Sequence, residues 1–388
     1  MPVATSGLCF DLSEDQAMIR EMVRKFALSD IAPGAAQRDR NQEFPRELLK
    51  KLGELGLLGI NTPSAYGGTE MDAISYAIAI EEISRVCGST GVAVSVQNTL
   101  AQLPIYTFGS ETLKKRYLPQ LVSGEKVGAY CLTEPSSGSD AGSLQTTAEK
   151  QGESYLLNGQ KVFVTNGFAA DFYVVYANID KSKGHKGVTA FVVERNFPGF
   201  KVVRKEEMLG VRASGTVQLA LENCKVPAEN RIGEEGIGMK IALTTLDSGR
   251  ISIAAQAVGI AQGAFDAALK YSQERQQFGK PISSFQFVQG MLVEMAVSIE
   301  AARLLVYRAS AQKDKGVKFT KEASMAKLFA ATMAEKATSQ AVQIHGGYGY
   351  TKDYPVERFY RDARVTQIYE GTSEVQMMVI ARQLLGAA

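Results

Sequence analysis

The apolar residues of this chain change their spacing twice, and that change limits the folds it can adopt. Up to about residue 125, and again from about residue 239, they recur at the three- and four-residue spacing of amphipathic helices. The intervening stretch instead carries short β-branched and aromatic runs, such as Phe172–Ala177 and Val188–Val193, between clusters of Gly, Asn and Asp. The pattern predicts helices, then a small β-domain, then helices again.

This pattern predicts a fold that is mainly α with a middle β-domain, an antiparallel barrel or sandwich, followed by a C-terminal helical bundle. The expected domains are residues 1–125, 126–235 and 236–388. Bundle helices are expected over 239–273, 284–312 and 319–344, each long enough for a bundle.

Several local signals mark where elements begin or turn. Ser13 and Gln16 have the spacing of a capping box at the first helix, and Ser373 and Gln376 repeat it at the last. The pair Asn158–Gly159 predicts a two-residue hairpin turn between strands at 155–157 and 161–165.

Composition excludes several classes of protein. The net charge is +2, and no run of Lys or Arg is long enough to indicate a nucleic-acid-binding surface. The two histidines, His185 and His345, lie far apart, so neither a histidine-based metal site nor a Ser-His-Asp triad is expected. The four cysteines form no CxxC pair and stand at Cys9, Cys87, Cys131 and Cys224.

That cysteine spacing fits a reducing compartment. No apolar run reaches the length of a membrane span, and residues 1–9 are expected to be a short tail without signal-peptide features. The expected location is the cytoplasm, or the mitochondrial matrix for a processed eukaryotic chain.

Two segments of the β-domain can approach a flat or anionic ligand. Residues Tyr130–Asp140 form a loop of small and hydroxyl-bearing residues, in which backbone N–H groups can come close to a bound group. Phe163–Gly167 ends a β-rich run with an aromatic ring and a hydroxyl. Each could equally be an ordinary turn or strand end.

Three segments of the helical C-terminal part are further candidates. Arg275 could bind a phosphate between two long helices, and the glycines of Gln343–Gly347 leave room for a ligand against the backbone. Glu370 lies between Tyr369 and Gly371 just before a helix. A carboxylate in such an aromatic-walled pocket can act as a base with a raised pKa, although capping the helix is the usual role of an acid there.

Taken in order, these motifs resemble the signatures of the acyl-CoA dehydrogenase family over nearly the whole chain. The motifs are PSAYGG (63–68), TEPSSGSD (133–140), VTNG (164–167), GVRAS (210–214), RQQFGKPI (275–282), QIHGGYGY (343–350) and IYEGTSE (368–374). The segment Leu246–Arg250 is most similar to the short-chain, butyryl-CoA branch.

The resemblance implies non-covalent FAD, a homotetramer built as a dimer of dimers, and a C-terminal four-helix bundle. It implies that Glu370 is the catalytic base and that Ser139, Asp247, Arg250 and Gly371 contact the CoA ester. The residues implied to hold FAD are Tyr130, Leu132, Thr133, Gly138, Ser139, Phe163, Thr165, Arg275, Phe278, Gln286, Gln343, Ile344, Gly346, Gly347, Thr372, Ser373 and Glu374. Of these, the set from Arg275 to Gly347 would reach the FAD of a neighbouring subunit.

The reaction implied is α,β-dehydrogenation of an acyl-CoA in fatty acid β-oxidation, with electrons passing to an electron-transferring flavoprotein. Two positions depart from relatives: Phe163 stands where most have Trp, and Gly249 stands where the isovaleryl and long-chain branches have their base. The second departure leaves Glu370 as the candidate base.

Several alternatives remain open at this stage. The same scaffold serves acyl-CoA oxidases and flavin monooxygenases, and a CoA-binding protein without catalysis is a further possibility. Branched, cyclic and glutaryl thioesters also remain possible substrates.

Overall fold

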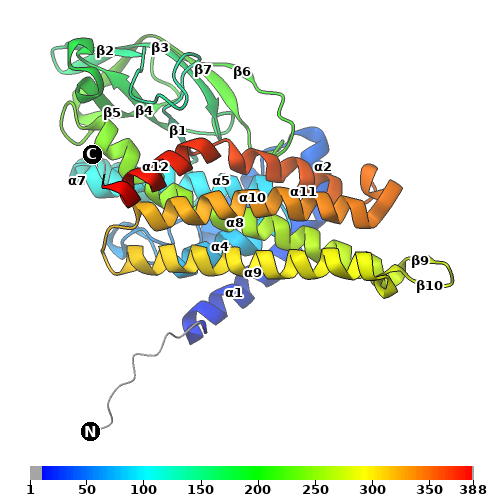
Figure 1. Ribbon diagram of the computed structural model, residues 1–388. Coiled ribbons are helices and arrows are strands. Elements are labelled where there is room, and N and C mark those ends of the chain that lie inside the picture. The colour runs from blue at the N-terminus through cyan, green and yellow to red at the C-terminus, as the bar shows by residue number, and fades with distance from the viewer. Residues whose placement is uncertain (1–10, 387–388) are drawn as a thin grey trace.

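The computed structural model describes residues 11–386, in which helices precede and follow a central sheet (Figure 1). The predicted fold class, mainly α with a middle β-domain, is confirmed. The tail expected at residues 1–9 lies outside the described residues, and the three domain boundaries stay a prediction.

Several helices precede the sheet, and one of them, the buried helix α4, packs against α1 and α5. These helices are α1 (Glu14–Phe26), α2 (Ala32–Asn41), α3 (Arg46–Glu54), α4 (Ala73–Ser84), α5 (Gly88–Ser95), α6 (Leu103–Phe108) and α7 (Glu111–Val122). The capping box predicted at Ser13 and Gln16 is confirmed, since both of its hydrogen bonds are present. Two π-helical turns, η1 (Ala27–Ile31) and η3 (Val96–Gln102), were not predicted.

The sheet has eight strands, and its pairing differs from the prediction. The strands are β1 (Gly128–Cys131), β2 (Thr147–Gln151), β3 (Ser154–Val164), β4 (Phe172–Asn178), β5 (Val188–Glu194), β6 (Phe200–Lys205), β7 (Val217–Pro227) and β8 (Arg231–Ile232). The order is β6-β7-β3-β2-β4-β5-β8, with β1 beside β4. The prediction of a purely antiparallel domain was wrong, because β4 pairs in parallel with both β1 and β2.

The predicted hairpin at Asn158–Gly159 was also wrong. The strand β3 runs through both residues and pairs with β7 on either side of a register shift between Leu157 and Gly159. Gly159 has φ +155°, and a Cβ there would lie 2.4 Å from the Thr146 hydroxyl. The extra residue of the bulge lies in β7, opposite the pair, and Gly159 lies where the backbone of Thr146 comes close, a use of strand glycine that local sequence does not distinguish from a turn.

The predicted bundle helices are confirmed within a few residues. They are α8 (Gly238–Glu274), α9 (Gln286–Asp314) and α10 (Thr320–His345), followed by α11 (Val356–Arg364) and α12 (Ser373–Leu385). A short hairpin of β9 (Gln276–Gln277) and β10 (Lys280–Pro281) projects from the end of the bundle between α8 and α9 (Figure 1). Within the described residues no helix is long and apolar enough to cross a membrane.

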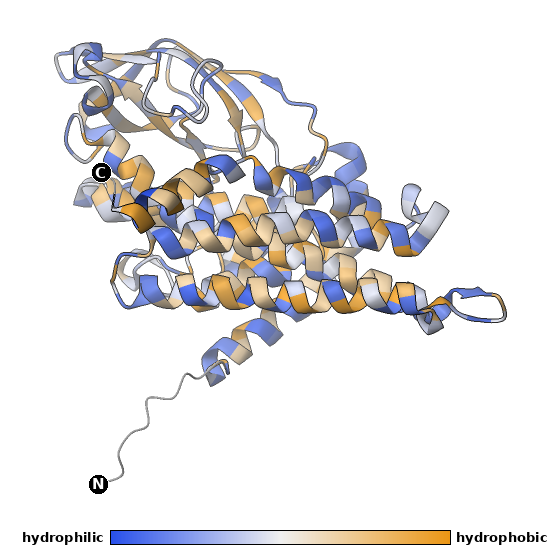
Figure 2. Cartoon of the chain, viewed as in Figure 1, coloured by the Kyte–Doolittle hydropathy of each residue, from blue (hydrophilic) through white to orange (hydrophobic). Residues whose placement is uncertain are grey.

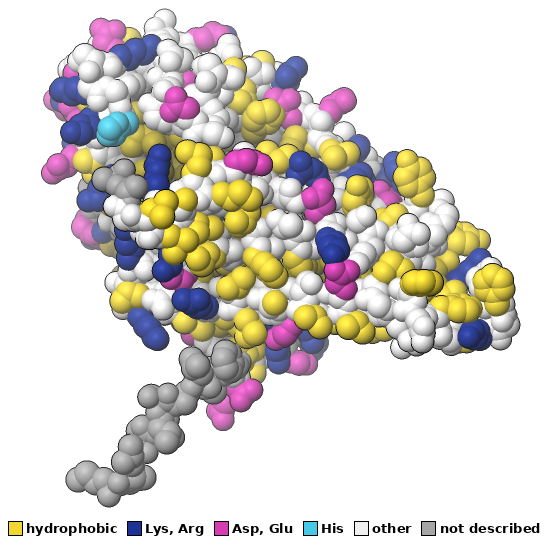
Figure 3. All heavy atoms as spheres, viewed as in Figure 1, with side chains coloured by type: hydrophobic (Ala, Val, Ile, Leu, Met, Phe, Trp, Pro, Cys, Tyr) yellow, Lys and Arg dark blue, Asp and Glu magenta, His cyan; other side chains and the backbone are white. Residues whose placement is uncertain are grey.

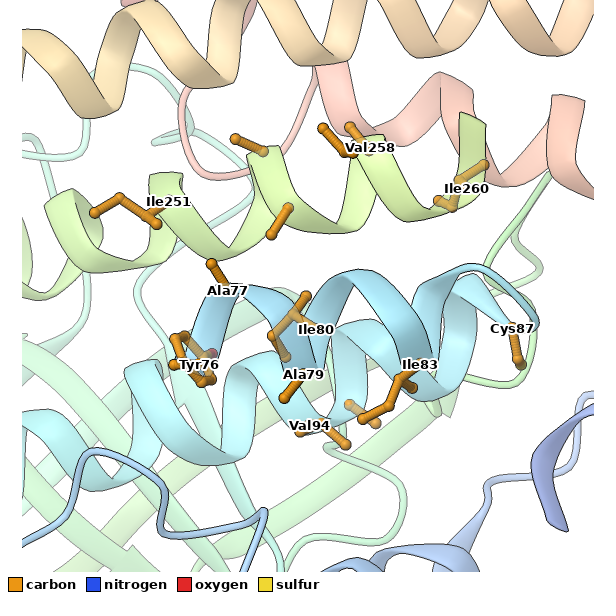
Figure 4. Packing of buried hydrophobic residues seen from close by; sticks show 14 of the residues in the cluster. Tyr76, Ala77, Ala79, Ile80, Ile83, Cys87, Val94, Ile251, Val258 and Ile260 are labelled. Carbon is orange, nitrogen blue, oxygen red and sulfur yellow. The ribbon is translucent and has the colours of Figure 1, made fainter. Parts of the chain in front are cut away.

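The helix α8 lies at the centre of the helical part of the molecule, where it packs against α4, α9 and α10. Apolar residues gather where these helices face one another, and apolar residues also lie among polar ones on the outward faces of α9, α10 and α12 (Figure 2). Ile251, Val258 and Ile260 of α8 belong to the same buried cluster as the apolar side chains of α4 (Figure 4). At Gly259 and Gly263 the two helices approach so closely that a Cβ would lie 2.2 and 2.1 Å from backbone oxygens of Glu81 and Arg85.

Candidate active site

Glu370 lies in a tight turn between a short 3-10 turn, η8 (Val365–Gln367), and α12. Both residues of the turn have left-handed backbone, with φ +54° at Glu370 and +92° at Gly371. Glycine adopts this conformation at no steric cost, but glutamate rarely does. Such strain at a non-glycine residue persists only where the surroundings hold it, and it is common at functional sites.

Glu370 is partly buried, and one oxygen of its carboxylate is buried without a partner among the described residues. Oε2 makes no hydrogen bond within the described residues, and it lies against α8, where a Cβ at Gly249 would be 2.0 Å away. Burial raises the pKa of Glu370 to about 7, and the charges of Lys327 and Arg250 oppose that rise. A carboxylate that changes protonation near neutral pH, with a free oxygen, is suited to accept a proton.

The alternative role of Glu370, capping the last helix, does not fit this geometry. The N-cap of α12 is Thr372, whose hydroxyl accepts a hydrogen bond from the Val375 amide at 3.3 Å. The prediction that Ser373 and Gln376 form a capping box was therefore wrong by one residue. Gln376 instead reaches back, and its Nε2 donates to the carbonyls of Glu370 and Gly371 at 3.2 and 2.9 Å.

The surroundings of Glu370 are apolar and aromatic. One cluster combines buried side chains of α5, η3 and α8 with the partly buried rings beside the base. Its members are Val92, Val96, Leu100, Val211 and Ile253, with Tyr130, Leu246, Val365 and Tyr369 against them. The cluster brings the first strand, the π-helical turn η3 and the Glu370 turn together, so Tyr130 and Glu370 share one site.

The candidate CoA-contacting residues of α8 lie beside the base. Arg250 is 5% exposed, and its Nη1 is 2.6 Å from Asp247 Oδ1. Asp247 also accepts a hydrogen bond from the Thr320 hydroxyl at 2.6 Å. The Nε of Arg250 is buried and has no hydrogen-bond partner in the described part of the chain, so this guanidinium retains an unused donor close to Glu370.

The predicted flavin loop, from Tyr130 to Ser139, is exposed to solvent near its C-terminal end and is hydrogen-bonded to the sheet near its N-terminal end. Gly138 and Ser139 are exposed, and a Cβ at Gly138 would meet nothing within 4 Å. Leu132 is buried, and the carbonyl of Thr133 accepts the Val162 amide at 3.0 Å. The loop therefore offers free backbone at its tip and is tied to β3 at its start.

A buried ion pair fixes this loop to the sheet. Lys161 of β3 is fully buried, and its Nζ lies 2.7 Å from Glu134 Oε1 and 3.2 Å from the Leu132 carbonyl oxygen. Glu134 also accepts the amides of Gln145 and Thr146 at 2.6 and 3.0 Å. This pair was missed from the sequence, although Glu134 lies inside the TEPSSGSD motif.

The candidate flavin contacts at the end of β3 are presented outward. Phe163 has φ +55° and is 63% exposed, and Thr165 is partly buried. Asn166, also left-handed with φ +65°, is fully buried and donates to the carbonyls of Ala93 and Gly128. A large ring held open to solvent by a fixed backbone fits a surface that receives a ligand.

A second group of candidates lies at the far end of the bundle. Arg275 ends α8, Phe278 at the hairpin tip is 93% exposed, and Gln286 begins α9. Near the end of α10, Gln343 is exposed and Ile344 is buried. Gly346 and Gly347 follow the helix, and a Cβ added at either would meet no atom of the described residues within 4 Å. Arg275 lies over the ring of Tyr348 at 5.6 Å, which joins the two parts of the group.

The two groups cannot serve one ligand within a single chain. Arg275 follows Gly249 by 26 positions along α8, which at 1.5 Å per residue is about 39 Å. The structure therefore brings together the candidates around Glu370, and separately those around Arg275, but it does not bring the two groups together.

The residues present fit FAD. The open Gly138–Ser139 backbone, the exposed Phe163 ring, and the unpartnered buried hydroxyl of Ser373 at the start of α12 are suited to a flat, hydrogen-bonding group. Thr372 and Glu374 flank that hydroxyl at a helix N-terminus. The exposed Arg275 and the uncovered glycines near Tyr348 are suited to a phosphate.

Comparison with known proteins decides the family. Models of the N-terminal, middle and C-terminal domains of acyl-CoA dehydrogenases match residues 13–125, 129–224 and 236–385. The chain belongs to the acyl-CoA dehydrogenase family. As in that family, its reaction is the FAD-dependent dehydrogenation of an acyl-CoA.

Individual relatives cover almost the full length of this dehydrogenase. A short-chain-specific acyl-CoA dehydrogenase of Clostridium acetobutylicum is 50% identical over 97% of this chain and 99% of its own. The butyryl-CoA dehydrogenase structure from Megasphaera elsdenii is 45% identical, with TM-score 0.95 over 97% of this chain and 100% of its own. A structure from work on the electron transferring flavoprotein of Acidaminococcus fermentans is 50% identical, with TM-score 0.96 over 97% and 100%.

Proposed function

We propose that this dehydrogenase oxidises short-chain acyl-CoA thioesters, with Glu370 as the base that removes the α-proton. The observation that carries the proposal is the buried, unpartnered Oε2 of Glu370, held against Gly249 in a strained turn. The short-chain-specific and butyryl-CoA-specific names of close relatives support the substrate class.

The work of the protein is to position the substrate and to control one proton. The carboxylate of Glu370 takes the proton from the α-carbon, and the apolar cluster around Tyr369 keeps water from competing for it. No hydrogen bond within the described residues uses the backbone amide of Glu370, so it is free to donate to the thioester carbonyl and make the α-proton more acidic. Bound FAD supplies the acceptor for the hydride that leaves the β-carbon.

A short acyl chain also fits the wall beside the base. Val92, Val96 and Leu100 are at most 5% exposed and pack against Ile253 and Tyr369, and we expect this packed wall to limit the length of acyl chain that fits beside the base. We expect kcat/KM to fall from butyryl-CoA through hexanoyl-CoA to octanoyl-CoA. A steady rise along this series, or preference for glutaryl-CoA or a branched thioester, would contradict the short-chain assignment.

The proposed assembly is a homotetramer, a dimer of dimers, in which Arg275 and its neighbours complete the FAD site of another subunit. Support comes from the separation of the two residue groups and from apolar side chains left exposed along α9, α10 and α12 (Figure 3). They include Phe287, Val293, Val297, Phe329, Met377 and Met378. Contiguous exposed apolar surface of this kind marks an interface.

The electron acceptor we propose is an electron-transferring flavoprotein, supported by the structural relative from such work. A cytoplasmic location is likewise proposed, supported by the free cysteines Cys87, Cys131 and Cys224. Slow reoxidation of the substrate-reduced enzyme by air, with fast reoxidation by the flavoprotein, distinguishes a dehydrogenase from an oxidase or a monooxygenase.

The deciding experiment is anaerobic reduction of the bound flavin in Glu370→Gln. Glutamine keeps the shape of the side chain and removes only the base, so FAD and acyl-CoA binding should persist while reduction slows by about 10²–10⁴-fold. Glu149→Gln, an exposed acid on β2, is the matched control and should reduce like wild type. Reduction of Glu370→Gln within tenfold of wild type would place the base elsewhere.

A further inference from the structure

Lys327, in the middle of α10, is a buried cation for which residues 11–386 provide no ion-pair partner. Its side chain is fully buried, and within the described residues its ammonium makes one hydrogen bond, to the Gly371 carbonyl oxygen at 2.6 Å. The other fully buried lysine, Lys161, has a carboxylate at 2.7 Å and a carbonyl as well. Lysines are seldom buried unless paired, because desolvating the charge is costly, so Lys327 is not explained by stability.

The one contact of Lys327 falls on the turn that carries the base. Glu370 and Gly371 both have left-handed backbone, and the same Gly371 carbonyl also accepts from Gln376 Nε2 at 2.9 Å. Two fully buried donors, from α10 and α12, therefore hold a conformation that glutamate does not favour by itself.

Lys327 also provides the least compensated positive charge near Glu370. The other cation that acts on this carboxylate, Arg250, is already paired with Asp247 at 2.6 Å. The remaining ionisable groups facing the pair are the phenols of Tyr76, Tyr130 and Tyr369, which are neutral at physiological pH, and the exposed Glu374 on α12. Because the surroundings are apolar, the charge of Lys327 is weakly screened.

We propose that Lys327 is a positioning residue for the base: its ammonium fixes the Glu370–Gly371 turn through the Gly371 carbonyl and stabilises the ionised Glu370 carboxylate. This inference rests on the proposed role of Glu370. It assigns to α10 a part in the chemistry that neither the motifs nor the family match assigns.

The test is the pH dependence of flavin reduction by butyryl-CoA under anaerobic conditions, measured by rapid mixing. Lys327→Met removes the charge and the donor, and Lys327→Gln removes the charge but keeps a donor. Loss of an opposite charge at close range raises a carboxyl pKa by about 1–3 units. Glu370 acts as a base only when it is ionised. In both variants the pH midpoint of the reduction rate should therefore rise by about 1–3 pH units. Lys327→Arg, which keeps the positive charge, should bring the midpoint back towards the wild-type value.

Matched controls separate this effect from general damage. Lys336→Met, on the same helix but exposed and paired with Glu294, should leave the midpoint and the FAD content unchanged. An unmoved midpoint in Lys327→Met or Lys327→Gln, or a rate loss equal at every pH, would overturn the inference. The Glu370→Gln variant tells the two proposals apart. If Glu370→Gln reduces the flavin at the wild-type rate, the proposed function fails. If Glu370→Gln is inactive but the pH midpoints of the Lys327 variants equal that of wild type, only the proposed role of Lys327 fails.

Discussion

Replacing Gly249 with alanine should separate stability from catalysis in this enzyme. Position 249 lies inside α8, where alanine is favoured over glycine by roughly 0.5–1 kcal/mol. The added methyl group would lie 2.0 Å from Glu370 Oε2 and 2.9 Å from its Cδ. The methyl group therefore clashes with the end of a side chain and not with backbone, so the carboxylate can yield while the helix remains.

The size of the effect follows from how far the carboxylate must move. Ordinary contact begins at 3.4 Å, so Oε2 must retreat by about 1.4 Å, and a misplacement of about 1 Å at a reacting group can cost on the order of 100-fold in rate. We expect Gly249→Ala to unfold at the wild-type temperature or above it, to retain FAD, and to reduce its flavin on the order of 100-fold more slowly.

The assay pairs thermal unfolding with anaerobic flavin bleaching by butyryl-CoA, and Gly263→Ala is the control. At Gly263 the added Cβ would lie 2.1 Å from the backbone oxygen of Arg85, so this variant should lose stability while each folded, flavin-loaded molecule reacts normally. A Gly249→Ala enzyme that is as fast as wild type would refute the argument, because the carboxylate would then not need its observed position.

Two further predictions concern cofactor retention and the stability of the protein. Arg275→Ala should weaken FAD binding on the order of 10–100-fold at unchanged helix content, because a charged hydrogen bond to phosphate is lost; equal FAD affinity in equilibrium dialysis would remove Arg275 from the site. Lys161→Met should destabilise the FAD-loaded protein by about 3–5 kcal/mol, because it leaves Glu134 buried without its cation. Denaturant unfolding beside Lys150→Met, which breaks an exposed pair with Glu235, measures the difference, and equal midpoints for the two variants would show that the buried pair is not needed.

The sequence predicted the helices well because their signals are local. The capping box at Ser13 and the bundle helices follow from periodicity and from polar residues at fixed offsets, and the structure confirms them. Asn158–Gly159 was misread because Asn-Gly is typical of a hairpin turn, and only the pairing of β3 along β7 shows that the strand continues through both residues. The parallel pairing of β4 depends on which strands meet in space, which short runs do not encode.

The site residues that lie inside sequence motifs could be predicted. Those that reach the site through contacts between distant segments of the chain could not. Glu370 was found because an acid followed by Gly371 precedes a helix. Lys327 was missed because it lies 43 positions earlier in a plain amphipathic helix, with no local sign that it is buried. Gln376 was taken for a capping residue because its spacing from Ser373 is right, whereas its amide holds the Glu370 turn.

The left-handed backbone at position 370 has an evolutionary consequence. The carboxylate needs to occupy one point in space, and a regular helix position, Gly249, lies directly beside that point. A protein with an acidic residue at position 249 and glycine at position 370 would therefore place its carboxylate near the same point. The glycine at position 370 would adopt φ +54° without strain. The same reaction can thus persist in a lineage while the residue that performs it changes place in the chain.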